Sequence, residues 1–196
     1  FIPRGSTALL DAVGRAIGET ENRLVKLADD DKPDKVIVVV MTDGYENASQ
    51  EIKRKDLIDT IGRVEKEEDW SIVYLGADQD AIKEGASIGV SSHTSAAYAG
   101  ASSANAIRMA SAKIGAYRST GVKGMMAYSA DDRSAMMSGD DSEVDAAINK
   151  MKDSTDQGKL HFLEMVLTFD CLTEWQQDRA LFQEKWLARQ VGQYRK

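Results

Sequence analysis

Two oxygen-bearing side chains, Thr7 and Asp43, have the residue types and the surroundings that a site for a hard cation requires. Thr7 belongs to a hydroxyl pair with Ser6, which follows Gly5 where a helix is predicted to begin. Asp43 follows an apolar run and precedes Gly44, which permits a sharp backbone turn. Mg²⁺ accepts carboxylate, hydroxyl and water oxygens. The ordinary alternatives are a helix cap for Thr7 and, for Asp43, a carboxylate that orders its own turn or caps the following helix.

The segments around these residues predict how they are positioned. Residues 36–41 form an uninterrupted apolar, mostly β-branched run, which is typical of a parallel strand buried on both faces. Helical spacing of apolar residues predicts helices over about 6–28 and 49–66, and residues 71–75 predict a second strand. We therefore expect an α/β fold with a doubly wound, mostly parallel, Rossmann-like sheet. Such sheets bind ligands at the carboxyl ends of their strands, where Asp43 is placed.

The rest of the chain is less regular. A short helix is predicted near 79–84 and a longer one near 102–117. A linker over 119–141 precedes a short helix that Ser142 caps, a strand over about 160–169 and a closing helix over about 173–190. We expect an α/β domain over 1–118, the linker, and a helix–strand–helix extension over 142–196.

Composition narrows the classes of partner and location. The net charge of −7 and the pI near 4.9 argue against nucleic acid, which requires a clustered basic face. The single cysteine, Cys171, excludes an internal disulfide, and no run of 18 apolar residues predicts a membrane span. We therefore expect a cytoplasmic protein that does not contact a membrane.

Three stretches resemble the von Willebrand factor A family, in its bacterial and phage-borne cytoplasmic branch: PRGSTALLDA (3–12), MTDGYEN (41–47) and YLGADQDA (74–81). The resemblance covers about residues 1–118. It implies a Mg²⁺ ion that is held by a D-x-S-x-S loop, a threonine and an aspartate, and that leaves one coordination position for a carboxylate of a protein partner. By resemblance, Thr7 matches the threonine and Asp43 matches the aspartate.

The D-x-S-x-S pattern does not occur in the 196 residues, and three explanations are open. In the family this loop precedes the GST segment, so the chain would be a fragment that begins inside the domain, as its start at Phe1 favours. Alternatively, the strand over 160–169 fills the vacant place in the sheet and puts Asp170 where the first metal aspartate would lie, with Thr173 near the hydroxyls. Third, the metal site is inactive and the domain is a packing scaffold.

The other motifs in the sequence give weaker evidence of function. Residues 85–89 fit G-x-S-x-G, but a predicted helix rather than a strand leads into the serine, which argues against a hydrolase. His93 and His161 lack a metal-ligand spacing, and no P-loop or dinucleotide-binding glycine pattern occurs. The closing helix has an apolar stripe that either belongs to the core or docks onto a neighbouring subunit. This stripe consists of Trp175, Leu181, Phe182, Trp186 and Leu187.

These observations favour a non-enzymatic protein-binding module with a Mg²⁺ site at Thr7 and Asp43. The alternative is a metal-independent structural assembly subunit, for example of a phage particle or filament, which makes its contacts through the closing aromatic helix. A homo-oligomer is compatible with both. A metal-assisted enzyme is disfavoured because no general base accompanies the predicted cation.

Overall fold

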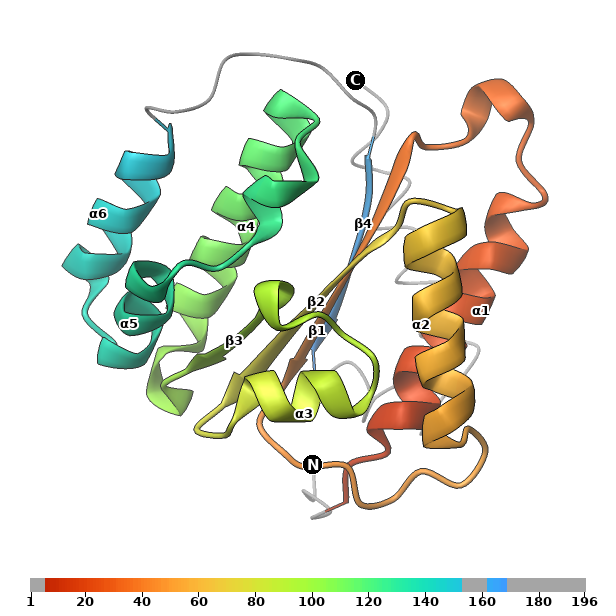
Figure 1. The fold of residues 1–196 in the computed structure, drawn as a ribbon, viewed down its shortest axis with the longest axis horizontal. Helices are drawn as coiled ribbons and strands as arrows, with labels where there is room; N and C mark the ends of the chain where they lie inside the picture. Colours follow the sequence, from red (N-terminus) through yellow and green to blue (C-terminus); the bar gives the residue numbers. More distant parts are fainter. Residues whose placement is uncertain (1–5, 153–161, 169–196) are drawn as a thin grey trace.

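The computed structural model describes residues 6–152 and the backbone of residues 162–168. Four strands form a parallel sheet in the order β3-β2-β1-β4, and helices cover both of its faces (Figure 1). The elements in chain order are α1 (Leu9–Leu24), η1 (Asp29–Asp31), β1 (Lys35–Thr42), α2 (Arg54–Glu67), β2 (Ser71–Ala77), α3 (Ala81–Ser87), η2 (Ser92–Thr94), β3 (Ser95–Tyr98), η3 (Gly100–Ser102), α4 (Ser103–Thr120), η4 (Lys123–Met126), α5 (Ala130–Ser138), α6 (Asp141–Lys152) and β4 (Phe162–Thr168). This is an α/β architecture, compatible with the predicted Rossmann-like fold.

The strand order reverses beside β1. From β1 the chain passes through α2 to β2 and through α3 to β3, always toward the same edge of the sheet. It then returns through α4, α5 and α6 and places β4 on the other side of β1, where Lys35 pairs with Phe162 and Met41 with Thr168. A reversal of this kind opens a crevice at the carboxyl ends of the two strands that flank it. The predicted strand over 160–169 is thus confirmed as a neighbour of β1.

The core lies in two layers, one on each face of β1. Val36, Val38 and Val40 pack with α1 and α2, whereas Ile37 and Val39 pack with α4, α5 and α6 on the opposite face. Figure 1 shows α1 and α2 on one side of the sheet and α4 to α6 on the other. Each fully buried side chain contributes about 1.5–3 kcal/mol. The prediction of a strand buried on both faces is confirmed, because both sets of its side chains are enclosed.

The structure corrects two sequence-based expectations about elements. Residues 119–141, predicted as a linker, contain the end of α4 together with η4 and α5, and Met126, Tyr128 and Met136 are buried in the core. The strand β3 was not predicted, because its residues Ser95–Tyr98 are mostly small and show no apolar periodicity. The predicted closing helix, with Trp175 and Trp186, lies outside the described residues.

Polar contacts hold α5 in place. The Lys113 ammonium of α4 lies 2.6 Å from the Asp132 carboxylate of α5, and both residues are buried. The Arg133 guanidinium donates hydrogen bonds to the carbonyl oxygens of Ser92 (2.6 Å) and Ser95 (3.2 Å), so α5 also covers the β3 edge of the sheet. No helix in the described part of the chain combines the length and the apolar character that crossing a membrane requires.

Candidate functional site

The start of α1 is capped from a distant loop. The N-cap residue is Ala8, which provides no side-chain hydrogen bond, and neither Ser6 nor Thr7 caps the helix. Instead, the Leu10 amide donates to Glu46 Oε2 (3.0 Å) and the Asp11 amide donates to Ser49 Oγ (3.1 Å). These bonds satisfy amides of the first turn that have no partner within the helix. The alternative interpretation of Thr7 as a helix cap is therefore wrong.

Thr7 lies against the turn that follows β1. Its amide donates to Asn47 Oδ1 (2.7 Å), and its carbonyl oxygen accepts from the amides of Asn47 (3.0 Å) and Ala48 (3.2 Å). Only 5% of Thr7 is exposed. Its Oγ1 lies so near Gly44 that a Cβ at that position would be 2.6 Å away. Within the described residues this hydroxyl forms no hydrogen bond, and it lies beside Gly44 in the turn after β1.

Asp43 does not order that turn either. The Thr42 hydroxyl does so, because it accepts from the Gly44 amide (3.1 Å) and donates to the Gly44 carbonyl oxygen (2.9 Å). Asp43 is exposed, and its carboxylate accepts no hydrogen bond in the described part of the chain. The next helix, α2, begins only at Arg54, and Asp43 does not cap it. Both structural alternatives for Asp43 are wrong, which leaves its carboxylate available to a ligand.

Two further carboxylates, which the sequence reasoning did not single out, fix this arrangement. Glu46 accepts from the amides of Leu10, Ala48 and Ser49 and from the Ser49 hydroxyl, at 2.7–3.0 Å. Asp11 accepts from three consecutive amides of residues 50–52, at 2.8–3.0 Å. Burial raises the pKa of each carboxyl, but the hydrogen bonds outweigh it and hold the pKa below its ordinary value. Asp11 belongs to the stretch PRGSTALLDA and Glu46 to the stretch MTDGYEN, and the family resemblance of these stretches is the sequence signal that includes them.

The carboxyl ends of β2 and β3 add Asp78 and Tyr98 to the same rim of the sheet. Asp78 has a positive φ of 50°. Its amide donates to the Tyr98 carbonyl oxygen (3.0 Å), and both of its carboxylate oxygens accept from the Gly100 amide (3.1 Å). Burial raises the pKa of the Tyr98 phenol, and the nearby charges of Asp43 and Asp78 raise it further. The register pairs Thr42 with Gly76 and Ala77 with Tyr98, so Asp43, Asp78 and Tyr98 lie at the same end of three adjacent strands.

The donor set that the described residues offer to a cation is small. Among them, no group of three or more His, Cys, Asp or Glu side chains could hold a metal ion. Thr7 and Asp43 offer one hydroxyl and one carboxylate, which are oxygen groups of the type that Mg²⁺ accepts, because this ion keeps several waters and is often held by one or two carboxylates. The strand β4 ends beside this rim, but Asp170 and Thr173 lie outside the described residues.

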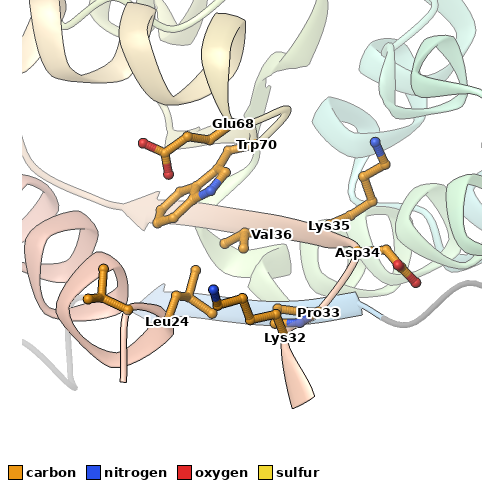
Figure 2. A pocket seen from close by; sticks show the side chains of 9 residues that line it. Leu24, Lys32, Pro33, Asp34, Lys35, Val36, Glu68 and Trp70 are labelled. Atoms are coloured by element: carbon orange, nitrogen blue, oxygen red, sulfur yellow. The ribbon is translucent and has the colours of Figure 1, made fainter. Parts of the chain in front are cut away.

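A cleft of about 250 Å³ opens at the opposite, amino-terminal end of the strands (Figure 2). Its four charged lining residues all have partners: Lys32 pairs with Asp29 (2.7 Å), Lys35 with Asp69 and Glu68 with Arg63, and Asp34 also has an interaction partner. Ligand sites normally combine an apolar wall with a few convergent polar groups that are free to bind. The cleft lacks such groups among its charged side chains, so the rim around Asp43 is the stronger candidate.

Comparison of the chain with models of protein families, with curated proteins and with solved structures finds no match. The resemblance of residues 1–118 to the von Willebrand factor A family therefore stays a prediction. The rim offers a set of oxygen atoms, including those of the exposed carboxylates of Asp43 and Asp78, that suits a cation or a donor of hydrogen bonds.

The contact between Thr7 and Gly44 predicts how a methyl group added at residue 44 changes stability. We expect Gly44→Ala to lower the free energy of unfolding by about 1–3 kcal/mol, because the new Cβ would overlap the Thr7 hydroxyl and force it to move. Urea unfolding at neutral pH measures this effect. The matched control is Gly18→Ala in α1, where a Cβ meets nothing within 4 Å and should stabilise the helix by up to about 1 kcal/mol. Equal unfolding midpoints for Gly44→Ala and the wild type would contradict the contact.

Proposed function

We propose that this chain is a doubly wound domain of the von Willebrand factor A type that binds a protein partner through a divalent cation, Mg²⁺, at Asp43 and Thr7. One observation carries the proposal: the Thr7 hydroxyl lies beside Gly44 at the carboxyl end of β1, next in sequence to the exposed Asp43, and neither side chain caps a helix or orders a turn. Residues of an α/β sheet in this position line the crevice where ligands bind.

Each residue has a distinct role in this proposal. Asp43 supplies negative charge and a carboxylate oxygen, and Thr7 supplies a neutral oxygen. Glu46 and Asn47 contact no ligand but fix the position of Thr7 relative to the turn. When it is bound, the cation offers a coordination position to an acidic side chain of the partner. The proposal is binding rather than catalysis, because the cation and a carboxylate of the partner are sufficient for it.

Titration with Mg²⁺, followed by calorimetry, tests the proposal without a known partner. We expect Asp43→Asn to weaken Mg²⁺ binding at least about tenfold, and Thr7→Val to weaken it while Thr7→Ser restores it. Asp59→Asn is the matched control. Asp59 is an exposed residue of α2 that pairs with Lys55, and its substitution removes the same negative charge as Asp43→Asn does. Circular dichroism should show an unchanged fold in all four variants.

Two results would overturn the proposal. One is Mg²⁺ binding by Asp43→Asn as tight as that of the wild type. The other is self-association or partner binding that persists in chelator but fails when Trp175 and Trp186 are replaced by alanine. The second result would favour the metal-independent assembly subunit, in which the predicted closing helix makes the contacts.

A further inference from the structure

We infer that the cleft at the amino-terminal end of the strands is the docking site for the carboxyl-terminal segment of the same chain, with Trp186 of the predicted closing helix seated in it. The inference is independent of the proposed cation, because the cleft and the rim around Asp43 lie at opposite ends of the strands. It assigns the apolar stripe of the closing helix to an intramolecular contact rather than to a neighbouring subunit.

The walls of the cleft suit an apolar side chain better than a polar ligand. Leu24, Val36 and Trp70, which belong to the core layer of α1 and α2, line it (Figure 2). At its edge Val25, which follows α1, is 80% exposed. The volume of about 250 Å³ lies below the roughly 300–1,000 Å³ of typical small-ligand sites. A single large apolar side chain that enters the cleft removes this surface from water.

The length of chain that follows β4 fits this position. Because β4 runs parallel to β1, it ends at Thr168 beside Met41, at the carboxyl end of the sheet. A helix that begins at residue 173 and runs back antiparallel to the strands rises about 1.5 Å per residue, which places Trp186 about 20 Å from its start. The strand β1 covers about 20 Å between Met41 and Lys35, at about 3.3 Å per residue. Trp186 therefore reaches the level of the cleft.

Charge complementarity supports the same occupant. The two stretches of chain that border the cleft are acidic: residues 29–34 carry four aspartates and one lysine, and residues 65–69 carry four acidic residues and one lysine. Among them, Asp31 and Glu67 are exposed and form no ion pair in the described part of the chain. Residues 185–196 carry four basic residues and no acidic one. Opposite charges around an apolar contact select this segment and fix its direction.

Disulfide trapping in the full chain tests this position. In a Cys171→Ser background, Val25→Cys is combined with Gln190→Cys, which lies one predicted helical turn beyond Trp186, and oxidised glutathione is the oxidant. A disulfide requires the two Cα atoms to lie about 4.4–6.8 Å apart, so a docked helix favours it. We expect an intramolecular disulfide, which electrophoresis without reductant detects as a compact monomer, to form at least about tenfold faster than in a matched control pair.

The matched control pair is Val25→Cys with Gln176→Cys. Gln176 lies on the same predicted helix face as Gln190, but about 21 Å nearer the carboxyl end of the sheet. In urea above the unfolding midpoint both pairs should react at similar rates, because loop closure depends only weakly on loop length. Trp186→Ala should slow trapping of the Gln190→Cys pair at least about tenfold, and Trp175→Ala, three turns away, should slow it less.

Three results would overturn the inference. The first is trapping of the two cysteine pairs at equal rates in native buffer, because the helix would then have no fixed position over the cleft. The second is a disulfide that forms only between two molecules, which would mean that the segment of a second copy occupies the cleft. The third is trapping in Trp186→Ala as fast as in its parent, with an unchanged circular dichroism spectrum. The buffer contains EDTA, so the result does not depend on Mg²⁺ binding at Asp43.

Discussion

Lys113→Met is expected to lower the free energy of unfolding by about 3–5 kcal/mol, the range found when one partner of a buried ion pair is removed. The Lys113 ammonium lies 2.6 Å from the Asp132 carboxylate, and the two residues are only 8% and 5% exposed. It also lies 5.8 Å from the centre of the Tyr128 ring. Methionine keeps the apolar stem but leaves the charge of Asp132 buried and unpaired. Urea unfolding at neutral pH measures the loss.

A double variant distinguishes the loss of the Lys113–Asp132 attraction from the cost of leaving the Asp132 charge buried and unpaired. In Lys113→Met/Asp132→Leu both charges are absent, so we expect most of the stability to return. A deficit of about 1 kcal/mol should remain, because Asp132 also accepts from the Ser129 amide (2.7 Å) in the capping box of α5. Lys150→Met is the matched control: its pair with Asp131 (3.3 Å) is exposed, and its loss should cost less than about 1 kcal/mol. A loss no larger than this in Lys113→Met would contradict the burial of the pair.

The elements that the sequence predicted correctly are those with a strong local pattern. Six consecutive apolar residues in β1, most of them β-branched, favour a strand enclosed on both faces, and the spacing of Leu9, Val13 and Ile17 favours a helix with one buried face. The four residues of β3 have no such pattern. Pairing with β2 and the contacts of Arg133 hold them in the sheet, and both come from residues far away in the sequence. The local sequence of these four residues does not specify a strand, and tertiary contacts determine that they form one.

The candidate site shows the same division. The position of Asp43 followed from the strand that precedes it, and the structure places the Thr7 hydroxyl beside the neighbouring Gly44. The capping of α1 could not be read locally, because Glu46 lies 36 residues from the amide of Leu10 that it accepts from. Asp78 and Tyr98 were missed for another reason: their proximity requires β3, which was not predicted. A site formed at the ends of several strands can be predicted from sequence only when each of those strands is itself predicted.

We expect Glu46→Gln to have the second largest effect on stability and to lower the free energy of unfolding by about 2–3 kcal/mol at neutral pH. Glutamine removes the charge and replaces one of the two accepting oxygens by an NH₂ group, so either the Leu10 amide or the amides of Ala48 and Ser49 lose their acceptor. Glu51→Gln is the control, because Glu51 lies in the same loop but is exposed and pairs with Arg15 on the surface. On the proposed function, Glu46→Gln also weakens Mg²⁺ binding, since Thr7 is no longer held at the turn.

The effect of pH gives this prediction a definite sign. The pKa of Glu46 is held below its ordinary value of 4.5, so its stabilisation is complete above that value and is lost as the pH falls through the lowered pKa. Glutamine does not titrate. The difference in unfolding free energy between the wild type and Glu46→Gln should therefore be constant near neutral pH and should shrink below about 4.5, as measured by urea unfolding from pH 7 to pH 3. A difference that stays constant to pH 3 would mean that the carboxylate contributes through shape alone, and that the charge of Glu46 does not hold α1 to the loop that carries Asp43.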